Sequence, residues 1–449
     1  MSDTLIYSKE INIRNMLLFT VPTMVRMIFV SMYSIVDGIV VSNFVGSLGL
    51  SAINIVYPVL NVCMAIAFML AAGSSAIIGK KLGEGRKHEA NSFMSLTVLL
   101  NLAAIIALAV VFLCFDEQIY MMLGSDEKML PYCVEYGTIM VLGGPFWAMQ
   151  VLFQSYLVTA DRPHLGLGLS ICAGLLNIVL DIILVGPLEM GMAGAALASV
   201  AGMVIAGTVP LLVFFNKNSV IHFEKPRWNG AEVLKSIGNG SSEMVSNLAS
   251  AVTTTLFNLQ MMALIGEKGV AAISAILYLQ FIFVAIFFGF ASGIAPVISY
   301  NYGAASLPRV KRTIKLTICT AMAIMAVGCL IFQLFPQQLL MFFNASEEML
   351  SIGSVALRII SVSFVLAGFD IIAGSVCQAI GNPLYSLITS VCRQLVVLLL
   401  VAWLLSHTGV LTLVWLAFPI SELVSLVLSA IFLRRTMRAV AERIGSRAA

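Results

Sequence analysis

Long apolar runs are the feature that most constrains the fold of this chain. Twelve of them follow one another with short connections, and each is long enough to cross the roughly 30 Å hydrocarbon core of a bilayer. In lipid the backbone must satisfy its own hydrogen bonds, so only helices or a closed barrel can span it. The runs are too long and too continuous for barrel strands. Since only 10% of the 449 residues are charged, against about 25% in soluble proteins, we predict an all-α polytopic membrane protein.

The apolar runs give the expected positions of twelve transmembrane helices. These spans are 15–42, 51–79, 90–115, 131–158, 164–186, 192–215, 231–265, 271–299, 310–334, 352–380, 384–406 and 410–433.

Lysine and arginine are distributed unevenly between the two sides of these spans. With the N-terminus inside, 20 of the 25 fall in inside segments, two in outside loops and three within spans. Cytoplasmic segments have the excess of basic residues in membrane proteins, so both termini are expected in the cytoplasm. We interpret the polar N-terminal stretch as retained, because no small-residue cleavage site follows a short apolar core.

An internal repeat divides the chain into two halves. With an offset of 220 in residue number, GSLGLSAI (46–53) falls on GEKGVAAI (266–273), and AIAFMLAAG (65–73) falls on AIFFGFASG (285–293). The offset spans six helices, so both halves have the same orientation. We therefore predict two six-helix bundles, residues 1–220 and 221–449, related by an axis along the membrane normal, with the substrate path between them.

Acidic residues inside the first-half spans form a candidate ion site, because an acid in a membrane span is costly and is usually functional. Asp37 lies in the first helix, and Asp181 lies in the fifth with Asn177 on the same face. Helical rise places both carboxylates in the outer half of the membrane, with Ser199 roughly 10 Å down helix six. The four oxygen-bearing groups suit H⁺ or Na⁺. Alternatively, Asp37 hydrogen-bonds a bent helix, Asp181 pairs with an arginine such as Arg26, and Ser199 bonds its own backbone.

The second half has different acids. The same offset places apolar residues opposite Asp37 and Asp181, so the first site is not duplicated. Glu243 on helix seven and Asp370 on helix ten are candidates for binding a cationic substrate or protons. They could instead pair with nearby arginines or face a cytoplasmic vestibule.

Other intramembrane charges have structural interpretations. We expect Arg393 on helix eleven and Glu422 on helix twelve to be partners, and Arg26 and Arg358 to snorkel or pair. Pro22 precedes Asp37 by roughly four helical turns. It removes a backbone hydrogen bond and gives helix one a hinge or a static kink.

Methionine and aromatic side chains facing a central cavity would give a deformable lining that tolerates cations. The candidates on the helices that would border it are Met27, Tyr33, Met64, Tyr278 and Phe281. The eight scattered cysteines and four histidines lack metal-ligand spacing, so we expect no cofactor and no metal beyond a possible Na⁺ at Asp37, Asn177 and Asp181.

The sequence resembles the multidrug and toxic compound extrusion (MATE) family of bacterial efflux transporters. The resemblance covers nearly the whole chain and includes Pro22 with Asp37 on helix one. Its other motifs are GSLGLSAINIVYP (46–58), GSSAIIGKKLGEGR (73–86) with GIAPVISYNYGAA (293–305), and ADRPHLGLGLSICAGLLNIVLDIILV (160–185).

The resemblance implies two six-helix lobes that export mostly cationic, amphipathic compounds in exchange for H⁺ or Na⁺ across the bacterial cytoplasmic (inner) membrane. It implies that Asp37, Asn177 and Asp181 match the cation-site positions of the N-lobe, with Ser199 where threonine is common. It also implies that Pro22 matches the proline associated with bending. Glu243 and Asp370 resemble acids that some subgroups use in the C-lobe.

We therefore expect a cation-coupled antiporter that works by alternating access on small organic cations, has no nucleic-acid partner and needs no more than a monomer. The alternative is a lipid-linked oligosaccharide flippase of the same superfamily, which would want a cationic cavity, whereas intramembrane acids outnumber arginines here. An aspartyl protease would need a GxGD-type context that Asp37 and Asp181 lack, so we do not expect an enzyme. The loops are too short for a receptor with a signalling domain.

Overall fold

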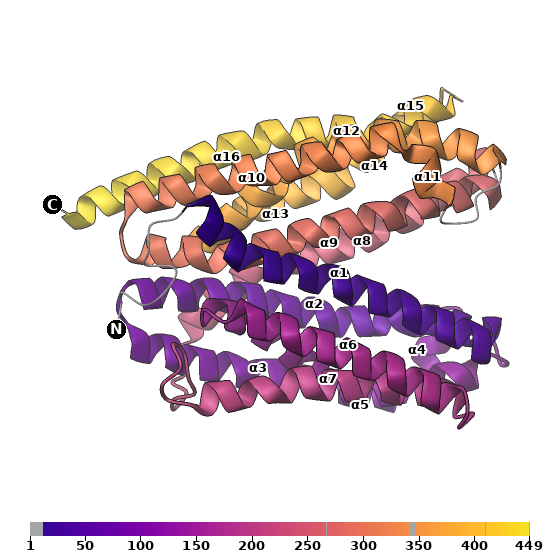
Figure 1. Cartoon of the computed structure of the whole chain (residues 1–449), viewed down its shortest axis with the longest axis horizontal. Coiled ribbons are helices and arrows are strands. Elements are labelled where there is room, and N and C mark those ends of the chain that lie inside the picture. Colours follow the sequence, from indigo (N-terminus) through magenta and orange to yellow (C-terminus); the bar gives the residue numbers. More distant parts are fainter. Residues whose placement is uncertain (1–11, 266, 342–346, 409, 449) are drawn as a thin grey trace. The chain divides into compact units, whose positions relative to one another are not determined.

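The computed structural model describes residues 12–265, 267–341, 347–408 and 410–448, and every regular element in these ranges is a helix (Figure 1). The helices of the first half are α1 (Ile13–Phe44), α2 (Ser47–Gly83), α3 (Lys87–Cys114), α4 (Asp116–Met122), α5 (Leu130–Thr159), α6 (Pro163–Val185) and α7 (Gly191–Phe215). Those of the second half are α8 (Gly230–Ile265), α9 (Glu267–Gly303), α10 (Leu307–Leu334), α11 (Pro336–Met341), α12 (Glu347–Ile380), α13 (Pro383–Val391), a π-helix η3 (Cys392–Val397), α14 (Leu398–Ser406), α15 (Leu411–Trp415) and α16 (Ala417–Ala448).

All twelve expected spans coincide with helices. Eleven helical segments in the described part of the chain are long and apolar enough to cross a membrane. The twelfth expected span, 231–265, is α8, whose first turns are polar and which is not among the eleven. The all-α polytopic architecture is therefore confirmed. The short helices α4 and α11 were not predicted, and their first residues, Asp116 and Pro336, are related by the offset of the sequence repeat.

The repeat is also present in the backbone. Gly85 after α2 and Ala305 after α9 both have positive φ, at 75° and 55°, and in each case the next N–H bonds the carbonyl five residues back, at 2.9 and 3.2 Å. Asp161 and Gly381, related by the same offset, have φ of 64° and 93° with the same bond at 2.8 Å in both. This is the Schellman helix ending. Because two non-glycine residues keep left-handed backbone there, the turn geometry itself is duplicated.

The chain forms two compact units. One is Val21–Gly240, here called the N-lobe, and the other, the C-lobe, is Ser241–Ala449 together with the chain up to Thr20. The two borders, after Thr20 and after Gly240, are also related by the repeat offset. The first helix of each half therefore begins in the other lobe: α1 begins in the C-lobe and α8 begins in the N-lobe. The division of the chain into bundles 1–220 and 221–449, which we inferred from the sequence repeat, stays a prediction.

Close packing inside the N-lobe explains why α8 begins in it. A Cβ added to Gly73 of α2 would lie 1.9 Å from the backbone oxygen of Ser236, and one on Gly240 would lie 1.8 Å from that of Met69. Without side chains at these positions, the backbones of α2 and α8 touch, as small residues allow in membrane helices. At the end of α2, Lys81 Nζ pairs with Glu232 at 2.7 Å. The first turns of α8 are therefore part of the N-lobe.

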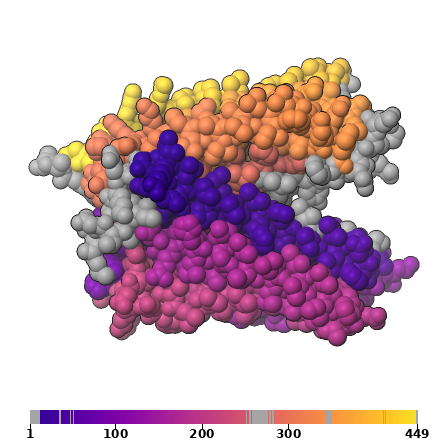
Figure 2. All heavy atoms as spheres, viewed as in Figure 1, coloured from indigo at the N-terminus to yellow at the C-terminus, as the bar shows by residue number. Residues whose placement is uncertain are grey.

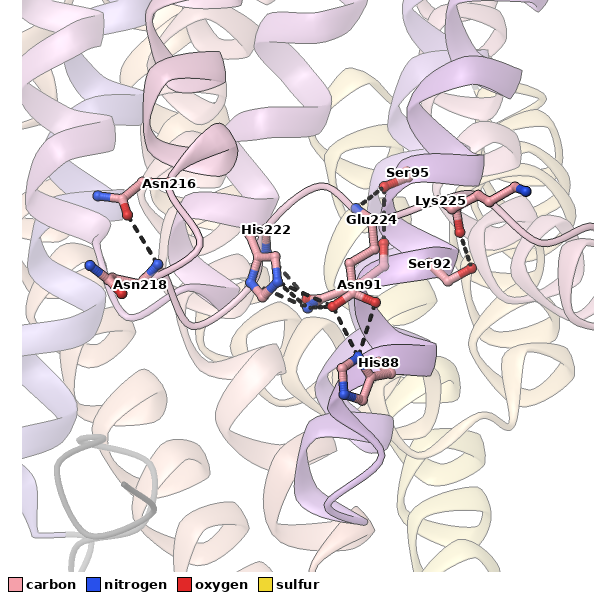
Figure 3. A network of polar contacts seen from close by, with 9 residues as sticks. All are labelled: His88, Asn91, Ser92, Ser95, Asn216, Asn218, His222, Glu224 and Lys225. Atoms are coloured by element: carbon pink, nitrogen blue, oxygen red, sulfur yellow. Dashed lines mark hydrogen bonds and ion pairs between the residues drawn. The ribbon is translucent and has the colours of Figure 1, made fainter.

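The linker between α7 and α8, residues 216–229, also lies on the N-lobe (Figure 3). On one face of α3, Ser92 and Ser95 hydrogen-bond the linker backbone, with Ser95 Oγ accepting from the N–H of Glu224 at 3.0 Å and Ser92 Oγ donating to the carbonyl of Lys225 at 3.0 Å. Phe223 packs against Phe214 of α7, with ring centroids 6.2 Å apart. Residues 222–227 of the linker therefore bind to α3 and α7.

The side chain of Glu224 is the centre of this contact. It accepts from Asn91 Nδ2 at 2.9 Å and lies 3.2 Å from His88 Nδ1 and 3.1 Å from His222 Nε2. Partial burial opposes ionisation of Glu224, but the hydrogen bonds from Asn91 and His88 and the charges of the two histidines outweigh it. The pKa of Glu224 is consequently held below its ordinary value.

Candidate functional site

The structure brings Asp37 of α1 and Asp181 of α6 together inside the N-lobe. Their carboxyl groups lie next to each other. Asp181 is completely buried, whereas Asp37 is partly exposed. Two acids in contact within a low-dielectric interior repel each other when both are ionised, so the pair favours sharing one proton or holding one cation.

A glycine on α6, Gly174, allows α1 and α6 to come close enough for the two acids to meet. A Cβ on Gly174 would lie 2.6 Å from the ring of Phe29 and 3.0 Å from that of Tyr33. The two aromatic rings of α1 therefore occupy the space that Gly174 leaves open, and the surfaces of the two helices adjoin in Figure 2. Asp37 follows Tyr33 by one helical turn, and Asp181 follows Gly174 by about two. Packing at the glycine thus sets the level at which the acids meet.

Asn177 and Ser199 join the pair from α6 and α7. Asn177 Nδ2 donates to Ser199 Oγ at 3.3 Å, and Asn177 also lies beside Asp181. The helices approach closely here because Gly202 has no side chain. A Cβ on Gly202 would lie 2.9 Å from the carbonyl oxygen of Ala173. The predicted group of four residues is therefore assembled at one level.

Several oxygen atoms at this site lack a hydrogen-bond donor. Asp37 Oδ1, both carboxylate oxygens of Asp181 and Asn177 Oδ1 are buried and accept no hydrogen bond of ordinary length from a described residue, although the Asn177 amide lies close to Asp181. Buried acceptors are normally satisfied, and leaving them bare costs free energy. A proton shared between the acids, or a small cation, would satisfy several of them at once. The donor set consists of hard oxygens, which fits H⁺ or Na⁺.

Tyr136 of α5 is a member of the site that the sequence analysis missed. Its side chain is 4% exposed and interacts electrostatically with both Asp37 and Asp181. The residue lies in the second turn of α5, at a depth that helical rise could have matched to the acids. The chain has 11 tyrosines, however, and depth alone did not distinguish this one.

Arg26 does not neutralise Asp181. Asp181 interacts with Asp37, while the interactions of Arg26 among the described residues are with Met27 and Tyr33. The alternative in which Arg26 pairs with Asp181 is therefore wrong for this structure. For Ser199, the alternative was a bond to its own backbone. In the structure its Oγ accepts a hydrogen bond from the Asn177 side chain.

The C-lobe contains a second acid cluster of different chemistry. Arg393 in η3 pairs with Glu422 of α16 at 3.2 Å, as expected, and both are partly buried. Asp370 of α12 is 3% exposed and lies beside Glu422, Ser425 and Ser429. Here two carboxylates share one arginine. Arg393 lies within the π-helix η3. Single π-helical turns are frequent at functional sites.

Glu243 is separate from that cluster. No described residue links it to Asp370; Glu243 lies on α8, partly buried, and its surroundings contribute burial alone. The C-lobe cluster is therefore built from Asp370, Glu422 and Arg393, and the prediction that Glu243 binds protons or substrate stays untested.

The remaining candidates are distributed along the first helices. Pro22 is buried inside α1, which continues through it. Met27 and Tyr33 are half-buried on α1, and Met64 borders a small gap between α2 and α5 beside Trp147. Tyr278 and Phe281 lie outside the residues whose side chains the structure describes.

Known proteins resemble this chain over almost its whole length. The model of the MatE family matches residues 22–183 and again 232–404. Multidrug export protein MepA of Staphylococcus haemolyticus is 25% identical over 423 residues, covering 92% of either chain, and an FAD transporter of Shewanella oneidensis is 24% identical, covering 91% of this chain and 92% of that protein.

Solved structures resemble the fold equally well. A structure described as the outward-facing conformation of a multidrug resistance MATE family transporter aligns with a TM-score of 0.89 at 23% identity, covering 95% of this chain and 96% of that one. With two matches to one family model, one in each half, the chain belongs to the MatE family, the multidrug and toxic compound extrusion transporters.

Proposed function

We propose that this transporter is a cation-coupled antiporter in which Asp37 and Asp181 bind the coupling ion. The observation that supports this most strongly is the cluster of four buried oxygens without a donor in the N-lobe. One H⁺ or Na⁺ would neutralise the pair and satisfy those oxygens together. Asn177 would add an amide oxygen and Ser199 would orient it, because Ser199 accepts from the Asn177 amide.

Coupling follows from a difference in affinity between two states. If the ion stabilises one arrangement of α1 and the substrate binds the other more tightly, each displaces the other without sharing contacts. α1 contains both the acid and the buried Pro22, so a bend at that proline would change the distance between Asp37 and Asp181. Loss of contact between the acids would lower the affinity for the ion.

In the C-lobe, Asp370 is the second exchangeable site in this proposal. One arginine cannot neutralise two carboxylates, so the cluster of Asp370, Glu422 and Arg393 would retain a proton or bind a cationic group. Ser425 and Ser429 lie beside Asp370 and would donate to its ionised form.

The proposed substrates are small, amphipathic organic cations, as for a multidrug exporter. Relatives named as a multidrug export protein and as an FAD transporter support small ring-containing molecules as the class. The excess of basic residues in one set of loops supports both termini in the cytoplasm. We propose that the protein works as a monomer in the bacterial cytoplasmic membrane without a cofactor.

The proposal is tested in proteoliposomes loaded with rhodamine 6G. A pH gradient and a Na⁺ gradient are imposed separately on the wild type and on Asp37→Asn, with Glu135→Gln, an exposed acid on α5, as the control. Dye movement driven by one gradient, lost in Asp37→Asn and kept in Glu135→Gln, is the expected result and names the ion. Gradient-driven export at the wild-type rate by a folded Asp37→Asn would contradict it. Movement with neither gradient would favour the flippase alternative.

A further inference from the structure

The three arginines within the spans have different surroundings. Arg393 has Glu422 as its partner at 3.2 Å, and Arg358 is exposed on α12. Arg26 is half-buried on α1, and its Nε is buried with no acceptor among the described residues. Among these residues its Nη2 donates to the sulfur of Met27, at 3.7 Å. A thioether is a weak acceptor. Arg26 is therefore a guanidinium without an anion in the described part of the chain.

The coupling acids cannot supply that anion. Asp37 lies about three helical turns from Arg26 on the same helix, a separation of roughly 16 Å, and Asp181 lies next to Asp37. At that distance the guanidinium of Arg26 cannot form an ion pair with either carboxylate, because an ion pair needs a nitrogen–oxygen distance of about 4 Å or less. Tyr33 lies between the two charges along α1 and interacts with both, but it is a neutral phenol.

The depth of Arg26 also argues against a lipid phosphate. Since α1 begins at Ile13, Arg26 lies roughly 20 Å along the helix. That is beyond the middle of a hydrocarbon core of roughly 30 Å, where head groups do not lie. A cation at this depth is costly unless it is paired. An anion that reaches it must belong to a molecule that enters the transporter.

We propose that Arg26 binds an anionic group, a carboxylate or a phosphate, of the transported molecule. This inference builds on the transport function proposed above and predicts that, among its substrates, amphipaths with an acidic group as well as a ring system bind more tightly. The guanidinium fork matches either anion in a bidentate manner. Arg26, Tyr33 and Asp37 follow one face of α1, at spacings of seven and four positions. The anion site and the ion site are therefore on the same face and far enough apart to be occupied separately.

The test uses two dyes that differ in one group, rhodamine 6G, an ethyl ester, and its free acid. Binding to purified protein is measured by fluorescence anisotropy for the wild type, Arg26→Gln, Arg26→Lys and the control Arg358→Gln. We expect the wild type to bind the acid more tightly than the ester. Arg26→Gln should weaken acid binding about tenfold or more and leave ester binding within about twofold. Arg26→Lys should retain part of the acid affinity, because it keeps the charge and loses the fork. Arg358→Gln should behave like the wild type.

Four results would overturn the proposal. Equal binding of the two dyes by the wild type would do so without any variant. Arg26→Gln that binds the free acid as tightly as the wild type does would also overturn it. So would an equal loss of affinity for the acid and the ester in Arg26→Gln. Phosphatidylglycerol that displaces the acid from the wild type but not from Arg26→Gln would assign the anion to lipid. Binding is measured without a gradient, so a failure of antiport in proteoliposomes is distinguishable from a failure of this inference.

Discussion

The N-lobe and the C-lobe use equivalent helix positions in opposite ways. In the N-lobe, Gly202 of α7 packs against the backbone of Ala173 of α6. The repeat offset carries these positions to Glu422 and Arg393, which form the ion pair of the C-lobe. A contact of small residues in one lobe is thus an electrostatic contact in the other.

The difference explains why the paired acids of the N-lobe lack a cation among the described residues, whereas the paired acids of the C-lobe have one. The C-lobe supplies its own positive charge, Arg393, to Asp370 and Glu422. The N-lobe supplies none to Asp37 and Asp181 in the part of the chain that the structure describes, so their charge must be neutralised from solution. We infer that the N-lobe acids respond most strongly to the coupling ion, while the Arg393–Glu422 pair of the C-lobe mainly holds helices together.

The largest effect is expected at Asp181. Asp181→Asn should lower gradient-driven dye export about 100-fold, because a neutral side chain cannot bind the ion in one state and release it in the other. Its thermal unfolding midpoint in detergent should not fall, since the change removes a buried acid that has no cation. A drop in the midpoint together with normal export would reverse the assignment of roles between the lobes.

In the C-lobe, Arg393→Met should act mainly on stability. Removing one member of a partly buried ion pair leaves the other uncompensated, at a cost of about 3 kcal/mol. The double variant Arg393→Met/Glu422→Leu should recover most of this loss in thermal unfolding. An Arg393→Met protein as stable as the wild type would show that the Arg393–Glu422 pair contributes nothing to the stability of the C-lobe.

A smaller effect is expected where the N-lobe has the small-residue contact. Gly202→Ala would place a Cβ 2.9 Å from the Ala173 oxygen, and the resulting helix shift should cost about 1–2 kcal/mol. Gly168→Ala on α6 is the matched control, because its Cβ would meet nothing within 4 Å. It should stabilise the helix by about 0.5–1 kcal/mol. Equal unfolding midpoints for the two variants would remove the packing argument.

The smallest effect concerns the linker. Glu224→Gln should lower N-lobe stability by about 1 kcal/mol at neutral pH. The pKa of Glu224 is held below its ordinary value, so its ionised form stabilises the fold above the ordinary carboxyl range, and that contribution is lost as the pH falls through the folded-state pKa. The difference in unfolding midpoint between variant and wild type should therefore disappear in acid. A difference that persists there would exclude the charge of Glu224 as its cause.

Much of the fold was accessible from sequence because apolar length and an exact repeat are strong constraints. They predicted helices at all twelve positions, eleven of which are long and apolar enough to cross a membrane. Depth arithmetic matched Asp37 with Asp181, and the two carboxyl groups lie next to each other. The short helix α4 was missed because seven residues contain no periodic signal. The joining of Asp370 to the Arg393–Glu422 pair depends on how α12, η3 and α16 rotate about their axes, which helix position alone does not determine. Tyr136 was missed for the same reason.

The central claim is that Asp37 and Asp181 hold an ion that the substrate displaces. The most direct measurement is the release of protons when rhodamine 6G is added to purified protein in weakly buffered detergent solution, with and without Na⁺. We predict that the wild type releases about one proton per dye bound, or Na⁺ in place of the proton when Na⁺ is present. The double variant Asp37→Asn/Asp181→Asn should release neither ion. Glu135→Gln should match the wild type. The same release from the double variant as from the wild type would contradict the account.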